Sequence, residues 1–146
     1  VRFFIAEGEI QMNIGKSYIE LCDEIEMWTF RKETIEDQVN YLMDKNKPKD
    51  IGAIDYSAPT GGTDVILDFE ELVNNIDPMQ NEIQRLDSLI QRLSKSKSMI
   101  EKKLESAKGV DYKIIYKRYV EGKSLKVVAE ELNYNYSWLR NKVARL

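Results

Sequence analysis

Histidine is absent from this 146-residue chain, and cysteine occurs once, as Cys22. A structural zinc site takes its ligands mainly from these two residue types, so the composition argues against such a site. An intramolecular disulfide bond and a catalytic pair with histidine as the base are excluded as well. The 25 Asp and Glu residues could still serve an enzyme, but they follow helical charge patterns that are typical of solvated helix faces. We expect no metal, no cofactor and no enzymatic activity.

Long apolar runs are missing too. No stretch approaches the roughly 18–20 apolar residues that a membrane-spanning helix needs. The opening sequence VRFFIAEGEI has one basic residue and two acids, which is unlike a signal peptide. The glycine pair Gly61-Gly62 lacks the spaced pattern of a nucleotide-binding loop. We therefore expect a cytoplasmic protein with no membrane contact.

What the chain does contain is helical periodicity. Apolar residues recur every three or four positions from Ile14 to Leu42, which predicts one long helix with a single buried seam. Residues 1–13 precede it as an N-terminal arm, to which we assign no function. The seam consists of Ile14, Tyr18, Leu21, Ile25, Trp28, Ile35, Val39 and Leu42.

A connection at residues 45–64, which holds two prolines and three glycines, ends this helix. Thr63 or Asp64 can cap a short helix from about Val65 to Ile76. Asp77-Pro78 then predicts the start of a new long helix, because proline is favoured in the first helical turn. The seam of that helix consists of Ile83, Leu86, Ile90, Leu93, Ile100 and Leu104.

A helix with one apolar seam cannot bury it alone. Residues 14–108 can solve this as an antiparallel hairpin within the chain, or by pairing between chains into a homodimer. Each seam is interrupted once by a lysine, Lys32 in the first and Lys97 in the second. Such a lysine either extends its ammonium group out of the seam, the interpretation that we favour, or sets the register of the pairing.

The pattern changes after Gly109, a candidate C-terminal cap of the second long helix. Residues 109–146, here called the C-terminal module, predict three short helices at about 111–121, 125–132 and 136–145. Gly122 ends the first of these helices, and Ser124 caps the second. The residues expected to face inward are Tyr112, Ile115, Tyr119, Leu125, Val128, Ala129, Leu132, Leu139 and Val143.

The last two helices have the spacing of a DNA-reading helix-turn-helix. Ala129 supplies the small residue that must sit where the two helices cross. The turn four residues later needs a positive φ, which Asn133 tolerates better than most residues other than glycine. Tyr134 and Leu139 occupy apolar positions of the motif. Lys142 occupies a further position that is usually apolar, and this is the departure from the pattern.

The basic residues of the chain are concentrated in this region. From Lys108 onward there are nine Lys and Arg residues and four Asp and Glu residues, giving +5, while the remainder of the chain carries −8. A basic patch of this kind typically contacts phosphates. Arg matches guanine and Asn matches adenine in the major groove. The candidate base-reading residues are Tyr136, Ser137, Arg140 and Asn141, and the candidate phosphate contacts are Lys123, Lys126, Lys142 and Arg145.

Trp138 has three interpretations: it closes the small core, it stacks on a backbone sugar of DNA, or it packs on the long helix. We favour a packing role over contact with DNA.

The segment YKRYVEGKSLKVVAEELNYNYSWLRNKVARL resembles region 4 of sigma-70-type factors, in which a helix ending in Y-x-x-G precedes SL-x-x-(I/V)-A-x-x-L. The chain also resembles small phage-encoded late-gene regulators of the RinA/ArpU type, through Asp55-Tyr56-Ser57, Gly61-Gly62, Asp77-Pro78, Arg118-Tyr119 and Lys123–Leu132. The resemblance implies transcriptional control in a phage or prophage, by an activator or a sigma-like factor. It does not extend to a sigma region 2, the part that melts DNA.

These observations predict an all-α protein with a long helical hairpin, or coiled coil, followed by a sigma region-4-like helix-turn-helix. The expected function is regulation of phage late genes, with double-stranded promoter DNA and RNA polymerase as partners. The alternative is a helical protein-interaction module that binds a host protein such as RNA polymerase without reading DNA.

Overall fold

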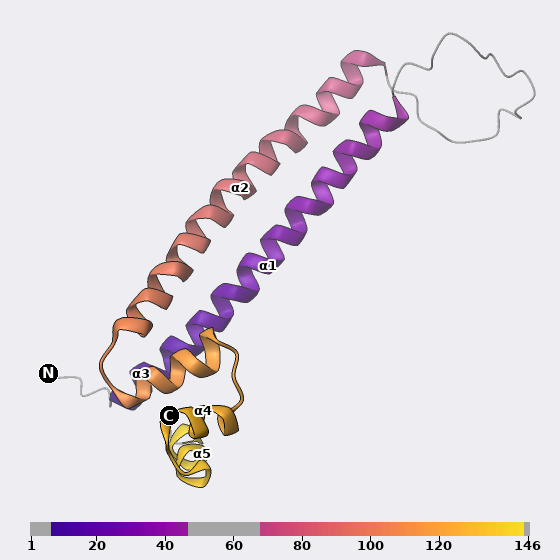
Figure 1. Ribbon diagram of the computed structural model, residues 1–146. Coiled ribbons are helices and arrows are strands. Elements are labelled where there is room, and N and C mark those ends of the chain that lie inside the picture. The colour runs from indigo at the N-terminus through magenta and orange to yellow at the C-terminus, as the bar shows by residue number, and fades with distance from the viewer. Residues whose placement is uncertain (1–6, 47–67, 145–146) are drawn as a thin grey trace, which may run out of the picture. The chain divides into compact units, whose positions relative to one another are not determined.

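The computed structural model describes residues 7–46 and 68–144, with side chains from residue 14 onward. It confirms the all-α prediction. The helices are α1 (Glu7–Lys45), α2 (Phe69–Ser106), α3 (Val110–Ile115), the π-helical turn η1 (Tyr116–Val120), α4 (Leu125–Leu132) and α5 (Tyr136–Ala144), as Figure 1 shows. No helix within the described ranges is both long enough and apolar enough to span a membrane.

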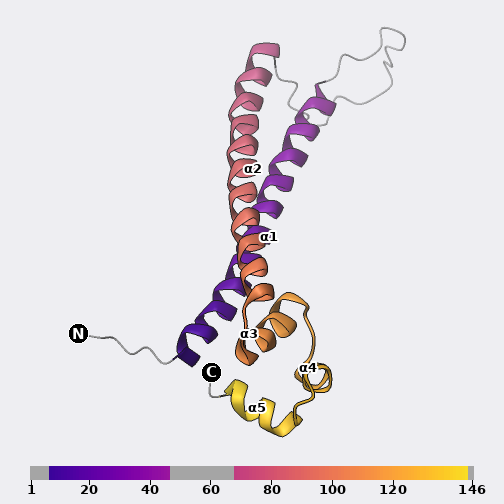
Figure 2. The ribbon, with the colours of Figure 1, turned by 60° about the vertical axis from the view of Figure 1, so that its left-hand side comes forward.

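The chain divides into two compact units, and each long helix contributes to both. The first unit comprises residues 1–26 and 91–146, and therefore contains the C-terminal module. The second unit comprises residues 27–90. In the first unit the module helices α3, α4 and α5 form one group (Figure 2).

The predicted seams are confirmed in both units. Every seam residue of α1 and α2 is buried or half-buried. In the second unit, Ile35 and Val39 of α1 are buried, as is Leu86 of α2. In the first unit, the Tyr18 hydroxyl of α1 donates a hydrogen bond of 2.7 Å to Glu101 Oε1 of α2. Paired helices within one chain thus account for the burial that the periodicity demands.

The two seam lysines make ion pairs, which corrects our preference for a solvent-directed side chain at Lys32. Lys32 Nζ lies 2.9 Å from Asp87 Oδ1 on the opposite helix and 3.7 Å from Glu36 Oε1 on its own helix. This interhelical contact raises the pKa of Lys32, chiefly through its hydrogen bond to Asp87. Lys97 Nζ lies 4.0 Å from Glu101 Oε1, the atom that accepts from Tyr18. The contact of Lys32 with Asp87 therefore favours one register of helix pairing, whereas the ion pair of Lys97 lies within α2.

The prediction that a new helix begins at Asp77-Pro78 is wrong, because α2 continues through Pro78 without interruption. Proline removes one backbone N–H, so the carbonyl of the residue four positions earlier loses its intrahelical partner. That residue is Asn74, which is exposed, so water can replace the lost donor. Buried Ile76 and Leu86 keep α2 packed on both sides of the proline.

Other helix ends also differ from the predicted positions. α1 begins at Glu7 rather than at Ile14, so half of the expected N-terminal arm is helical. Asp68 directly precedes α2: its carbonyl accepts from the Leu72 N–H at 2.8 Å, and its side chain accepts from the Phe69 N–H at 2.8 Å. α2 ends at Ser106 instead of at Gly109, which precedes α3. Several predicted features lie outside the described residues. They are the expected loop from residue 47 onward with its motifs Asp55-Tyr56-Ser57 and Gly61-Gly62, the predicted caps Thr63 and Asp64, and Arg145.

The expected helix at 111–121 is divided between α3 and the π-turn η1. The Glu121 N–H donates to the Tyr116 carbonyl, five residues earlier, which is the hydrogen bond of a π-helix. The prediction allowed this segment a single inward face, yet Ile114 and Ile115 are both buried. Ile114 joins the core of the module, whereas the ring of Tyr119 lies against Gly15 of α1, where a Cβ atom would approach Tyr119 Cε2 to 2.7 Å. The segment is covered on two sides, which one face of a regular helix cannot provide.

The seam of the second unit predicts a large difference between two substitutions. Leu86→Ala should lower the free energy of unfolding by about 2–5 kcal/mol, because Leu86 is 0% exposed and its removal leaves a cavity. Met27→Ala, at a side chain that is 72% exposed, should change it by less than about 0.5 kcal/mol. Urea denaturation followed by circular dichroism measures both. Equal effects would contradict the packing described for this unit.

Candidate nucleic-acid interface

The core of the C-terminal module forms where α4 and α5 cross. Val128 and Leu139 are 0% exposed, Ile114 is 2% exposed, and Ala129 is 3% exposed. A larger side chain than that of Ala129 would push α5 away from α4, since protein cores are close-packed. The partly buried residues that complete this cluster are Val110, Leu125, Leu132 and Val143. The inward set that the sequence predicts for α4 and α5 is therefore confirmed.

Backbone conformations at both ends fix the length of α4. Gly122 adopts a φ of 69°, a left-handed conformation that glycine tolerates, before the chain turns into α4. Ser124 then caps the helix, because its side chain accepts from the Val127 N–H. At the other end Asn133 has φ 57° and ψ 38°, and the Tyr134 N–H donates to the Ala129 carbonyl at 2.9 Å. The predicted positive φ at Asn133 is confirmed.

The start of α5 depends on a residue that our reading of the sequence missed. Asn135 Oδ1 accepts from the Ser137 N–H at 2.8 Å and from the Trp138 N–H at 3.4 Å. The Asn135 carbonyl also accepts from the Leu139 N–H at 3.0 Å, so Asn135 acts as the N-cap. The sequence signal that could have identified it is the known preference of asparagine for the N-cap position of a helix. Asn133 and Asn135 together set the direction in which α5 leaves the turn.

Helical spacing arranges α5 in stripes of residues four apart. Leu139 and Val143 form the inward stripe. Ser137 and Asn141 form the opposite, outward stripe, and both are exposed. On one edge between these stripes lie Tyr136 and Arg140, and on the other lie Trp138 and Lys142.

The candidate base-reading residues are all exposed on α5. Tyr136 has an exposed fraction of 45%, and Ser137, Arg140 and Asn141 are exposed as well. Arg140 has no acidic partner among the residues that the structure describes. Its guanidinium therefore keeps its donors available, as does the Asn141 amide, so this surface can present donors and acceptors to base edges.

Lys123, in contrast, is held in an ion-pair network inside the module. Its Nζ lies 2.8 Å from Glu121 Oε2 and 2.7 Å from Glu131 Oε1. Lys117 joins the same acids, at 2.6 Å from Glu131 Oε2 and 3.7 Å from Glu121 Oε2. Hydrogen bonds from Lys117 and Lys123 lower the pKa of Glu131, and those to Glu121 and Glu131 raise the pKa of Lys123. The network ties η1 to α4 and balances the charge of Lys123.

Lys142 explains why a lysine can occupy a usually apolar position. Its Nζ lies 3.0 Å from Asp111 Oδ1 of α3, and this carboxylate oxygen is buried. No hydrogen bond satisfies the Asp111 oxygen within the described residues, so the contact balances charge without directed hydrogen-bond geometry. Lys142 thus joins α5 to α3 as an apolar residue would, and its charge is not free.

Lys126 differs from both of these lysines. It is exposed on α4 and has no acidic partner among the residues described, so its ammonium group remains available for a phosphate. The remaining candidate phosphate contact, Arg145, lies outside the described residues.

The packing role that we favoured for Trp138 is wrong. The side chain is 45% exposed. It stacks on Tyr134, with the ring centroids 4.8 Å apart and the ring planes at 25°. Lys142 Nζ lies 5.3 Å from the centroid of the Trp138 ring. The only sign of this arrangement in the sequence is the spacing of four residues between Tyr134, Trp138 and Lys142.

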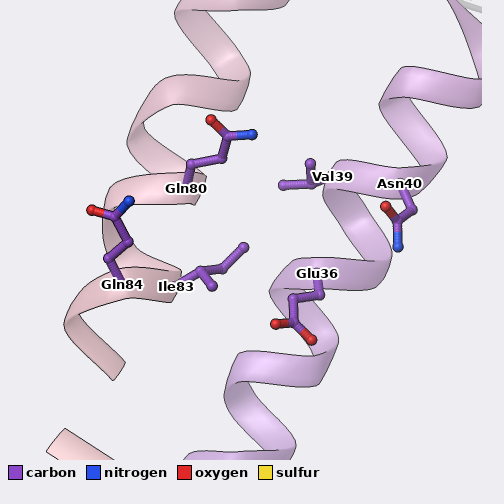
Figure 3. A pocket seen from close by; sticks show the side chains of 6 residues that line it. All are labelled: Glu36, Val39, Asn40, Gln80, Ile83 and Gln84. Atoms are coloured by element: carbon purple, nitrogen blue, oxygen red, sulfur yellow. The ribbon is translucent and has the colours of Figure 1, made fainter. Parts of the chain in front are cut away.

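A hollow lies between α1 and α2 in the second unit, with a volume of about 530 Å³. Figure 3 shows Val39 of α1 and Ile83 of α2 pointing toward each other across it. Amides of Asn40, Gln80 and Gln84 and the carboxylate of Glu36 complete the lining. Within the described parts of the chain no three His, Cys, Asp or Glu side chains gather as metal ligands. This hollow is a groove between paired helices.

Comparisons of the chain with protein-family models, with curated proteins and with solved structures find no match. The resemblance to late-gene regulators therefore stays a prediction from the motifs.

The turn between α4 and α5 allows a matched pair of substitutions. Asn133→Ala should lower the free energy of unfolding by about 1–2 kcal/mol, because a left-handed conformation strains an alanine. Asn133→Gly should be neutral within about 0.5 kcal/mol, since glycine adopts this φ freely. Chemical denaturation measures both. If alanine were tolerated as well as glycine, the left-handed turn would be wrong.

Proposed function

We propose that this protein is a DNA-binding transcription regulator that recognises duplex promoter DNA through α5. The observation that carries the proposal is the exposed face of Tyr136, Ser137, Arg140 and Asn141 on a helix held by a close crossing at Ala129. An α-helix fits the major groove, where each base pair presents a distinct pattern of donors and acceptors. Arg140 and Asn141 supply the two side chains best suited to guanine and adenine.

Affinity for any duplex comes largely from phosphate contacts. The residues from Lys108 onward carry +5, but Lys117, Lys123 and Lys142 are paired with acids of the C-terminal module. The exposed lysines without an acidic partner among the described residues are Lys108, Lys113 and Lys126. We therefore expect few phosphate contacts and a moderate dependence of binding on salt.

The regulatory class follows from the motifs of the module. The resemblance to sigma region 4 and to RinA/ArpU-type regulators supports a role at phage or prophage late promoters, as an activator or a sigma-like factor. RNA polymerase is then a second partner, and the cytoplasm is the compartment where both partners lie.

A second candidate function is protein interaction through the second unit. Met27 and Phe30 are each 72% exposed on α1, and Tyr41 is 59% exposed. Exposed apolar side chains of this size favour a protein contact. Co-purification with a host protein that survives high salt, together with no retention of DNA at low salt, would favour this function over DNA recognition.

The exposed face of Tyr136, Ser137, Arg140 and Asn141 is called the reading face. Its role is tested by selecting duplexes from a random-sequence pool and measuring their binding to the protein by gel shift. Arg140→Ala should weaken binding to the selected duplex by about 1–3 kcal/mol and relax the preference at one base pair. Asn141→Ala should act likewise at a neighbouring base pair. If the wild type selects no sequence, or if both variants bind like the wild type, the proposed function fails.

Two lysines provide a matched test of the phosphate contacts. Lys126→Ala should lower the slope of log affinity against log salt by about 1, because one phosphate contact is lost. Lys123→Ala should leave this slope unchanged, since the Lys123 charge is already balanced by Glu121 and Glu131. Fluorescence anisotropy with a labelled duplex, titrated at several salt concentrations, measures both slopes. Equal decreases would contradict the ion-pair network.

A further inference from the structure

Trp138 lies beside the reading face of α5, and the function proposed above does not use it. A half-exposed tryptophan is unusual for a small module, because burying an aromatic ring is strongly favourable. Its orientation is nevertheless fixed, by the Tyr134 ring at 4.8 Å and the Lys142 ammonium at 5.3 Å from the ring centroid. A large side chain that is both held in place and left in solvent has the properties of a contact residue.

The two edges of α5 differ in available charge. When a helix lies in a groove of DNA, its outward stripe faces the bases, and the side chains on its two edges reach base edges or the sugar–phosphate backbones on either side. One edge offers Arg140, which has no acidic partner within the described residues. The other edge consists of Trp138 and Lys142, and the Lys142 charge is balanced by Asp111 at 3.0 Å. That second edge therefore meets DNA with an aromatic ring and without a free cation.

We propose that Trp138, supported by Tyr134, packs against the sugar–phosphate backbone of duplex DNA at this edge of α5. This inference rests on the proposed function and adds a contact to the same interface. The indole ring offers apolar surface to a deoxyribose, and its N–H can donate to a phosphate oxygen. Such a contact positions the helix without reading sequence.

DNA is a better occupant for this edge than a protein. The ring belongs to a module that carries +4, and it lies one stripe away from Ser137 and Asn141. A partner that reaches the reading face of α5 must pass the edge where Trp138 lies. Base stacking is a poorer fit, since part of the ring already stacks on Tyr134.

The test compares Trp138→Ala with Tyr41→Ala. Tyr41 is a matched control, because it is also an exposed aromatic near a lysine, with Lys45 Nζ 5.7 Å from its ring, but it lies in the second unit. Trp138→Ala should weaken binding about tenfold to both a selected duplex and a scrambled duplex of the same length, as expected for the loss of one packed aromatic contact. The salt slope should not change. Tyr41→Ala should bind like the wild type.

A second measurement does not depend on how well Trp138→Ala folds. The chain has two tryptophans, so Trp28→Phe leaves Trp138 as the sole reporter. Adding the duplex should change its fluorescence and shield it from quenching by acrylamide.

The outcomes separate this inference from the proposed function. The inference is overturned if the wild type binds duplex DNA, Trp138→Ala binds it equally well, and Trp138 in the Trp28→Phe variant stays accessible to acrylamide when DNA is bound. The ring then faces another partner. If Trp138→Ala weakens only the selected duplex, the ring contacts a base and the backbone assignment is overturned. If the wild type binds no duplex at all, the proposed function fails, and the inference fails with it.

Discussion

The close crossing of α4 and α5 at Ala129 is the constraint on which the C-terminal module depends. It allows Val128 and Leu139 to be fully buried within a core of very few side chains. Burial of Leu139 fixes the rotation of α5 about its axis, and that rotation decides which residues face outward. Asn133 and Asn135 then set the path of the turn, one through a positive φ and the other by capping α5. A core this small gives the module little excess stability, since short domains bury a smaller fraction of their surface than large ones.

Charge within the module has two roles that composition alone does not separate. Lys117 and Lys123 fasten η1 to α4 through Glu121 and Glu131, and Lys142 joins α5 to α3 through Asp111. These partly exposed pairs contribute little stability individually. Their main effect is to orient the helices and to neutralise lysines that could otherwise contact phosphates. The net charge of the module is thus a poor measure of how many phosphates it contacts.

The sequence predicts those features that repeat or that depend on one residue type. Seam spacing identified both long helices, because burial imposes a period on apolar residues. The turn was predictable from Asn133, since few residues tolerate a positive φ. Pro78 was misleading because local preference for a helix start was overridden by the seam on both sides of it. The turn η1 involves contacts between segments distant in sequence, such as Tyr119 against Gly15. The outward position of Trp138 follows from the rotation of α5 that the burial of Leu139 sets, which the apolar pattern alone did not resolve.

The central claim is that α5 meets DNA. The most direct test is the amide spectrum of the ¹⁵N-labelled protein, recorded by nuclear magnetic resonance as duplex DNA is added. The account predicts that the largest shifts occur for residues 136–141 at the start of α5, with those of Met27–Lys45 unchanged. Shifts concentrated in Met27–Lys45 while α5 stays unchanged would contradict it.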